Sequence, residues 1–231
     1  MGTAMLILVI IFAGGILIAF LYRFIRPARI SASERIASGP SFFNERSLDF
    51  PKGLYFDKSH TWAFMELDGN VRIGLDDFMQ HVAGTVSRVK MKFPGDTVKK
   101  GEKIFSIVQN GKQLSIHSPV SGIIRSQNES LLADSSAINT SPYSDGWIYL
   151  IEPSNWIRET QFMIMAERYS EWLKNEFSRL RDFFATSLRT HMPEYAHVVL
   201  QDGGDLKDHI LEDFGPEVWE DFQTHFIDGL S

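Results

Sequence analysis

Short apolar runs alternate with turn-forming residues through the middle of the chain. Between Leu54 and about Trp156, each run is rich in Val, Ile and Leu and is bounded by Gly, Pro, Asn or Asp. Many short strands at this spacing are typical of a β-sandwich or β-barrel. A short helix is predicted over residues 76–83. The predicted strands are Val71–Leu75, Gly84–Met91, Lys103–Val108, Gln113–His117, Gly122–Ser126 and Trp147–Glu152.

After Pro153 the apolar residues recur at steps of three and four, which predicts an amphipathic helix from Phe162 to Leu188. Its apolar face packs either on its own domain or on a partner. Residues 203–231 are acidic, with apolar side chains interspersed, and predict two short helices broken at Gly215-Pro216. They form either a solvated acidic face or a partner-docking tail. The apolar residues of this tail are Trp219, Phe222, Phe226 and Ile227.

The N-terminus contains an apolar run, residues 4–22, without a charged side chain. As a helix it would span roughly 28 Å, close to the hydrocarbon thickness of a bilayer. No charged side chain precedes the run, which argues against a cleaved signal peptide. Arg23, Arg26 and Arg29 follow it. Basic residues stay on the cytoplasmic side, so we expect a single-pass anchor in the inner (cytoplasmic) membrane, with the bulk of the chain in the cytoplasm.

These patterns divide the chain into four parts. Residues 1–29 form the transmembrane anchor and its basic flank. Residues 30–53, rich in Ser and containing Pro40 and Pro51, are predicted to be a linker. Residues 54–156 form the β domain, and residues 157–231 form a helical, acidic C-terminal extension.

Composition and charge exclude several kinds of site. The formal net charge of −6 argues against nucleic acid as a partner, because phosphate binding needs a basic surface. The absence of cysteine excludes disulfides, thiolate metal sites and a cysteine nucleophile. No phosphate-binding loop or catalytic triad stands out, so we predict that the chain is not an enzyme. We also predict no metal site, because no two histidines show metal-ligand spacing. The seven histidines of the chain are His60, His81, His117, His191, His197, His209 and His225.

Four segments of the β domain resemble the glycine cleavage H protein family, in the same order and with similar spacing. They are LYFDKSHTWAFME (Leu54–Glu66), GLDDFMQHVAGTVSRVKMKFPGDTVKKGE (Gly74–Glu102), HSPVSGII (His117–Ile124) and SPYSDGWIYLIEPSNW (Ser141–Trp156). The resemblance implies a mainly β fold, a lipoyl/biotinyl-type barrel-sandwich hybrid, here with an N-terminal transmembrane helix and a C-terminal α-helical extension. In the family, a lysine at a hairpin tip is joined by an amide to lipoic acid, and the protein is a carrier rather than a catalyst.

The resemblance makes Lys112 the candidate lipoyl attachment residue, one position later than the family motif requires. Counting eight residues back from Pro119, as in the family, gives Gly111, and counting forward from Gly101 agrees. Asn110-Gly111 predicts a type I′ turn, which places Lys112 on the first residue of the next strand. Phe105 favours Lys112, because the family also has Phe seven residues before its lysine. A one-residue slip would, however, turn each strand side chain to the opposite face.

Three functions therefore remain open. The first is a membrane-anchored H-protein-like domain without lipoate, acting as a scaffold or accessory subunit of a membrane-associated complex through its C-terminal extension. The second is a lipoylated aminomethyl or redox carrier that uses Lys112. The third is an efflux-type membrane fusion adaptor, which GDTVKKGEKIFSI also resembles. Such adaptors split the lipoyl halves with a long helical hairpin, whereas Asn110-Gly111 is the whole connection here.

Overall fold

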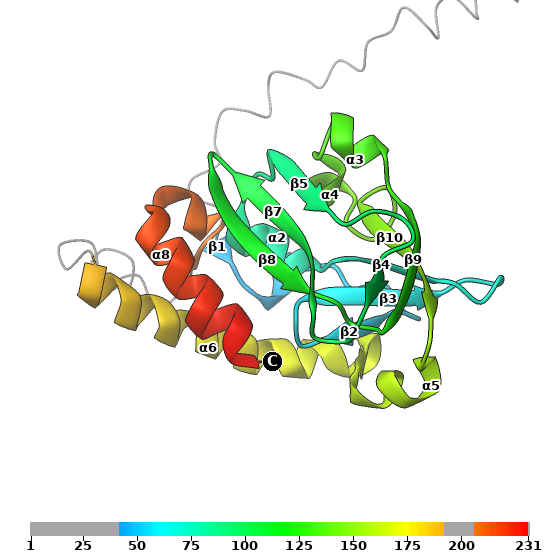
Figure 1. The fold of residues 1–231 in the computed structure, drawn as a ribbon. Coiled ribbons are helices and arrows are strands. Elements are labelled where there is room, and N and C mark those ends of the chain that lie inside the picture. Colours follow the sequence, from blue (N-terminus) through cyan, green and yellow to red (C-terminus); the bar gives the residue numbers. More distant parts are fainter. Residues whose placement is uncertain (1–41, 192–205, 231) are drawn as a thin grey trace, which may run out of the picture. The chain divides into compact units, whose positions relative to one another are not determined.

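A seven-stranded antiparallel sheet forms the larger part of the fold in a computed structural model, which describes residues 42–191 and 206–230 (Figure 1). Its strand order is β11-β2-β3-β4-β10-β9-β6. Apolar residues alternate along each long strand and therefore lie on one face of it. The strands pair so that these faces cover a common core. The strands are β2 (Tyr55–Asp57), β3 (Thr61–Met65), β4 (Val71–Leu75), β6 (Thr97–Val98), β9 (Gly122–Gln127), β10 (Trp147–Pro153) and β11 (Ile164–Met165).

A three-stranded antiparallel sheet faces the same core and carries the hairpin of interest. It contains β5 (Arg88–Met91), β7 (Lys103–Gln109) and β8 (Lys112–His117), in the order β5-β7-β8. The buried residues of both sheets belong to one apolar cluster. The predicted mainly β fold is therefore confirmed as a mostly β sandwich. A third, two-stranded sheet pairs β1 (Phe42–Phe43) with β12 (Leu206–Lys207).

Short helices connect the strands. The predicted helix after β4 is confirmed as α2 (Asp77–Ala83), which begins where the Asp76 side chain accepts a hydrogen bond of 2.8 Å from the backbone N–H of Met79. It ends at Gly84, whose φ of 81° suits glycine. The other short helices are η2 (Glu45–Ser47), α3 (Ser130–Ala133), α4 (Ala137–Thr140), α5 (Trp156–Glu159) and η3 (Thr160–Phe162).

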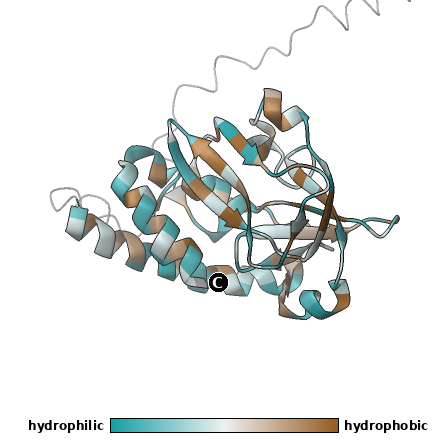
Figure 2. Ribbon diagram, in the orientation of Figure 1, coloured by the Kyte–Doolittle hydropathy of each residue, from teal (hydrophilic) through white to brown (hydrophobic). Residues whose placement is uncertain are grey.

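The long amphipathic helix is confirmed as α6 (Ala166–His191), beginning four residues after the predicted start. Its apolar stripe is buried against its own domain, while its other face is polar, so apolar and polar colours alternate along it in Figure 2. Phe162 precedes the helix and is exposed. No helix in the described ranges is long and apolar enough to cross a membrane, and residues 4–22 lie outside those ranges. The buried stripe consists of Tyr169, Leu173, Phe177, Leu180, Phe184 and Leu188.

The C-terminal segment, residues 206–230, runs between α6 and β8 (Figure 1). It contains η4 (Ile210–Asp213), α8 (Pro216–Asp221), a π-helical turn η5 (Phe222–Ile227) and η6 (Asp228–Leu230). The predicted break at Gly215-Pro216 is confirmed, with Pro216 in the first helical position. The four apolar residues of the predicted tail are buried in the chain's own core: Trp219, Phe222, Phe226 and Ile227.

The predicted domain boundaries are revised by this packing. Phe43, in the predicted linker, is buried and its ring lies 4.7 Å from that of Phe177 on α6. The backbone N–H of Asp49 donates a hydrogen bond of 2.7 Å to the Asp77 carboxylate. Apolar contact and a satisfied backbone donor overcome the low β and helix propensity of this stretch. Residues 42–53 and the C-terminal extension thus belong to the same compact unit as the β domain.

A buried charge network joins the β domain to α6. His60 is fully buried, with Nδ1 at 3.0 Å from Asp76 and Nε2 at 3.1 Å from Glu176. Burial opposes the positive charge, but the two carboxylates outweigh it and raise the pKa of His60 to about 9. Arg179 pairs with Glu176 and donates a hydrogen bond of 2.7 Å to the carbonyl of Phe226. The network therefore extends from the β domain through α6 to the C-terminal segment.

The His60 network predicts a loss of stability at alkaline pH. The folded-state pKa lies above the unfolded value of 6.5, so the stabilisation is complete below pH 6.5 and is lost as pH rises through about 9. We expect the free energy of unfolding to fall by up to about 3 kcal/mol over this interval, from the size of the shift. Urea unfolding across this pH range measures it. In His60→Gln the fall should be largely absent, and parallel profiles for the two proteins would contradict the assignment.

Candidate functional site

The β7–β8 hairpin ends in the tight turn that the sequence predicts. Asn110 and Gly111 have φ of 48° and 83°, the pair of positive values that defines a type I′ turn. Gln109 and Lys112 pair across the hairpin on either side of them. Lys112 is therefore the first residue of β8, as predicted. The two-residue turn also leaves no room for the long helical hairpin of an efflux adaptor.

Gly111 occupies the outermost position of this turn. It is exposed, and no atom lies within 4 Å of the place where a Cβ would stand. A side chain at this position would project into solvent, where several enzymes could reach it. Glycine supplies no nucleophile or amine there, so the position that the ungapped motif assigns to the prosthetic arm has no group to which an arm could be joined.

Lys112 does have an amine, but the C-terminal segment surrounds it. Its Nζ atom lies 2.8 Å from the carbonyl oxygen of Phe214, 3.1 Å from that of Glu212 and 3.4 Å from that of Leu211. The same atom lies 4.9 Å from the centre of the Trp219 ring, within cation–π range. We call this arrangement, Lys112 with the three carbonyls and the Trp219 ring, the lysine clamp.

The contacts of the lysine clamp follow from the polarity of a helix C-terminus. The last carbonyls of a helix have no partner within the helix, and η4 ends at Asp213. An ammonium group offers three donors and carries the positive charge that favours a helix C-terminus. Trp219 is fixed in turn, because its indole N–H donates a hydrogen bond of 2.8 Å to the carbonyl of Leu211. Partial burial lowers the pKa of Lys112, and nearby Glu212 and Asp213 oppose this effect.

The residues at the tip do not fit an attached lipoyl group. An amide at Lys112 would remove the positive charge and leave Nζ a single donor, so the three carbonyls and the indole ring would lose their common partner. Gln109, three positions before Lys112, is uncharged and buried, only 4% exposed. Whether Lys112 is modified stays a prediction, and the geometry favours an unmodified amine.

The S-H-T-W stretch, residues 59–62, has a packing role in the structure. His60 belongs to the buried network described above. Trp62 is 1% exposed, and its indole N–H donates a hydrogen bond of 3.1 Å to the carbonyl of Pro142. It lies flat against Gly74, where a Cβ would stand only 2.6 Å from the indole ring. A larger residue than glycine at position 74, the cross-strand partner of Trp62, would therefore clash with the indole ring. The buried Trp62 side chain is a packing residue.

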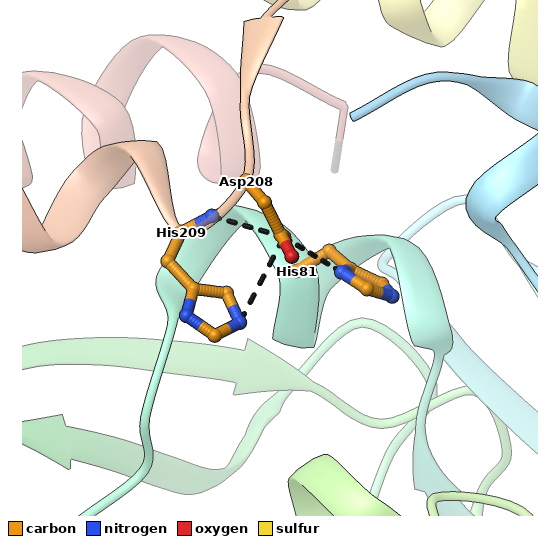
Figure 3. Close-up of side chains that lie close together, drawn as sticks. All are labelled: His81, Asp208 and His209. Carbon is orange, nitrogen blue, oxygen red and sulfur yellow. Dashed lines mark hydrogen bonds and ion pairs between the residues drawn. The ribbon is translucent and has the colours of Figure 1, made fainter. Parts of the chain in front are cut away.

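The structure brings together one cluster of side chains that the sequence does not predict. His81 on α2 meets Asp208 and His209 from the C-terminal segment, and one potential ligand atom from each lies within 4.8 Å of the others (Figure 3). The histidines are 128 positions apart, so no spacing rule could have paired them. The sequence predicted no metal site, and the structure supplies a donor set that the prediction did not consider. A cavity of about 620 Å³ adjoins it, lined in part by His81, His209 and Tyr143.

Comparison with known proteins identifies relatives of the β domain. The family model described as "Glycine cleavage H-protein" matches residues 54–176, which extends into α6 and beyond the resemblance recognised in the sequence. The chain is 36% identical over 124 residues to the "Probable glycine cleavage system H protein" of Pyrococcus abyssi, covering 54% of this chain and 92% of that protein. It is 36% identical over 129 residues to the "Glycine cleavage system H protein" of Stenotrophomonas maltophilia, covering 55% and 97%.

Among solved structures, the chain is similar to a glycine cleavage system H protein from Mycobacterium marinum, with a TM-score of 0.43 and 26% sequence identity. That similarity covers 46% of this chain and 87% of the other. Residues 1–53 and 177–231 lie outside the family match. The Trp219 ring and all three carbonyls of the lysine clamp therefore come from outside the matched region.

The lysine clamp predicts that Lys112 holds the C-terminal segment in place. In Lys112→Ala the three carbonyls lose their shared donor, and we expect a destabilisation of about 1 kcal/mol, the usual net value of such contacts. Amide hydrogen exchange between residues 210 and 222 should become faster, because the segment opens more often. Lys90→Ala is the matched control, since Lys90 on β5 bonds to the side chain of Gln113 on β8 and not to the C-terminal segment. Equal exchange in both variants would show that the clamp contributes nothing.

Proposed function

The chain belongs to the glycine cleavage H-protein family, and on that premise we propose that it is a non-catalytic member that carries no lipoate. In this proposal it serves as a scaffold or accessory subunit of a membrane-associated complex. The observation that supports it best is the lysine clamp. The amine of Lys112, the residue that follows the hairpin tip, is held by backbone carbonyls of a segment outside the family match.

A carrier needs the opposite arrangement. Its arm must visit several active sites, so its attachment point must be accessible and its charge must be lost when the amide forms. Here the exposed tip residue, Gly111, has no side chain, and the neighbouring amine is bound. Neither position meets the requirement of a swinging arm, whereas both fit a rigid docking domain.

We place the protein at the inner membrane, through residues 4–22, with the described domain in the cytoplasm. The support is the length of the uncharged run and the arginines that follow it. An anchored domain needs no diffusing cofactor arm to act as a fixed platform. Its tether also restricts it to partners at the same surface.

We propose that a protein partner binds the outer face of the C-terminal segment. The apolar residues of this segment are buried in its own core, and acidic side chains outnumber basic ones among those left exposed. Asp213, Glu217 and Glu220 are exposed there. Such a face suits a basic partner surface and provides orientation and association rate more than bulk affinity.

The second candidate is a lipoylated carrier that uses Lys112. It is favoured by family membership and by the position of Phe105. For it to operate, the C-terminal segment would have to leave the hairpin, which would expose Trp219 and the end of η4. The membrane fusion adaptor has less support, because the turn between β7 and β8 comprises only Asn110 and Gly111.

Intact mass separates the first two candidates. We expect the full chain, purified from cells that lipoylate an authentic H protein in parallel, to show no added lipoyl group. Lys112→Arg serves as the site control and Trp219→Ala as the variant with a loosened clamp. A lipoyl adduct on the native chain that disappears in Lys112→Arg would overturn the scaffold proposal. An adduct in Trp219→Ala alone would show that the clamp blocks the modification.

Membrane anchoring is tested by fractionation of cells that express the full chain or a deletion of residues 4–22. We expect the full chain to require detergent for extraction and the deletion variant to remain in the supernatant. Extraction of the full chain by salt alone would rule out a spanning anchor.

The acidic face predicts a second result. Partners that co-purify with the full chain should be lost when Asp213, Glu217 and Glu220 are changed to Lys, since charge reversal opposes binding of a basic surface.

A further inference from the structure

The cluster of His81, Asp208 and His209 combines two imidazoles and one carboxylate, which is a donor set for a first-row divalent metal ion. From this geometry we propose that the three side chains bind such an ion, with Zn²⁺ as the reference, and that the ion fastens the C-terminal segment to α2. The proposal does not rest on the proposed function, since it holds whether or not Lys112 carries lipoate.

The donor atoms are already close to the required separations. The distance from Asp208 Oδ1 to His81 Nδ1 is 2.7 Å, and from the same oxygen to His209 Nε2 it is 3.7 Å. Ligands about 2.1 Å from a tetrahedral zinc ion stand roughly 3.4 Å apart. The two distances bracket this value, and the ligand atoms of all three residues lie within 4.8 Å of one another, so rotation of the side chains would seat an ion among them. The ion would replace the proton now shared by His81 and Asp208, and that proton would be released.

Contacts behind the ligands hold them in place. The other nitrogen of His81, Nε2, lies 3.7 Å from the Asp77 carboxylate, an ion-pair distance on the side of the ring away from Asp208. Asp77 is fixed by Gln80, whose amide donates a hydrogen bond of 2.7 Å to it. The His81 ring also stacks on Phe43, with ring centres 5.3 Å apart. This ring is therefore oriented before any ion arrives.

The backbone of His209 provides an independent observation. Its φ of 59° lies in the left-handed region, which costs about 1 kcal/mol or more for a residue with a side chain. The conformation allows its N–H to donate a hydrogen bond of 2.8 Å to the carbonyl of His81. It also directs the imidazole toward Asp208, as Figure 3 shows. A strained residue whose side chain completes a donor set is where a functional constraint is expected.

The adjoining cavity gives the ion an entry path and further ligand positions. It measures about 620 Å³, and Thr140, Ser141 and Tyr143 line it beside the two histidines. Three protein ligands leave a tetrahedral ion one position for water or a small anion on this side. Two imidazoles select zinc, nickel, cobalt or iron over calcium and magnesium, which prefer oxygen ligands. Because η4 follows His209 directly, an ion here would also fix the position of η4, whose carbonyls bind Lys112 in the lysine clamp.

Zinc titration of the metal-free full chain in detergent, against a chromophoric chelator, tests the proposal. We expect one zinc ion per chain and a drop in affinity of at least about tenfold in His209→Asn and in Asp208→Asn. Asparagine tolerates the left-handed backbone of His209, so the first variant should fold. His191→Gln is the matched control, because His191 pairs with Asp221 away from the cluster and should leave the affinity unchanged.

Two further readouts make the outcome decisive. Co²⁺ bound at the cluster should give a visible absorption band that disappears in His209→Asn, and zinc should slow hydrogen exchange in residues 206–214 of the native chain alone. Unchanged zinc affinity in His209→Asn, or no binding to the folded native chain, would overturn the proposal. Circular dichroism of each variant distinguishes loss of the site from loss of the fold.

Discussion

The fold depends on burying a positive charge without leaving it unpaired. His60 stands in the turn before β3, and the carboxylates that satisfy it come from the start of α2 and the middle of α6. An uncompensated buried charge would cost several kcal/mol, so neither helix can leave without a large loss of stability. Arg179, which pairs with Glu176, extends the network to the C-terminal segment. It donates a hydrogen bond to the Phe226 carbonyl, and its guanidinium carbon lies 3.6 Å from the centre of the Phe226 ring.

That constraint explains why the additional segments and the family domain form one unit. Several polar contacts attach the C-terminal segment, and three of them are the Phe226 carbonyl, the lysine clamp and the contact of Asp208 with His81. Each uses a charged group to satisfy polar atoms that an apolar interface would leave unpaired. The C-terminal segment thereby packs on the family-matched domain and contacts the hairpin at Lys112, while the tip residue Gly111 stays exposed.

The sequence predicts what depends on local pattern and fails where distant residues meet. The six predicted strands, which correspond to β4, β5, β7, β8, β9 and β10, follow from periodicity and turn chemistry, as do α2, α6, the Asn110-Gly111 turn and the break before Pro216. The packing of Phe43 does not, because its stretch is rich in Ser, contains Pro40 and Pro51 and shows no sustained apolar period, so it resembles a linker. The cluster at His81 has no local signature, since its ligands come from α2 and the C-terminal segment. Likewise, the sequence places Lys112 beside a tip but cannot show which carbonyls surround it.

The lysine clamp also has a consequence for the time course of synthesis. Lys112 is separated from the carbonyls that bind it by 99 to 102 positions along the chain. At ribosomal rates of about 5–20 residues per second, the amine emerges roughly 5 to 20 seconds before its partners. During that interval the nascent hairpin resembles an ordinary carrier, with its lysine uncovered. Emergence of residues 211–219 closes the interval, so the rate of translation up to them sets how long modifying enzymes can reach Lys112 on the β7–β8 hairpin.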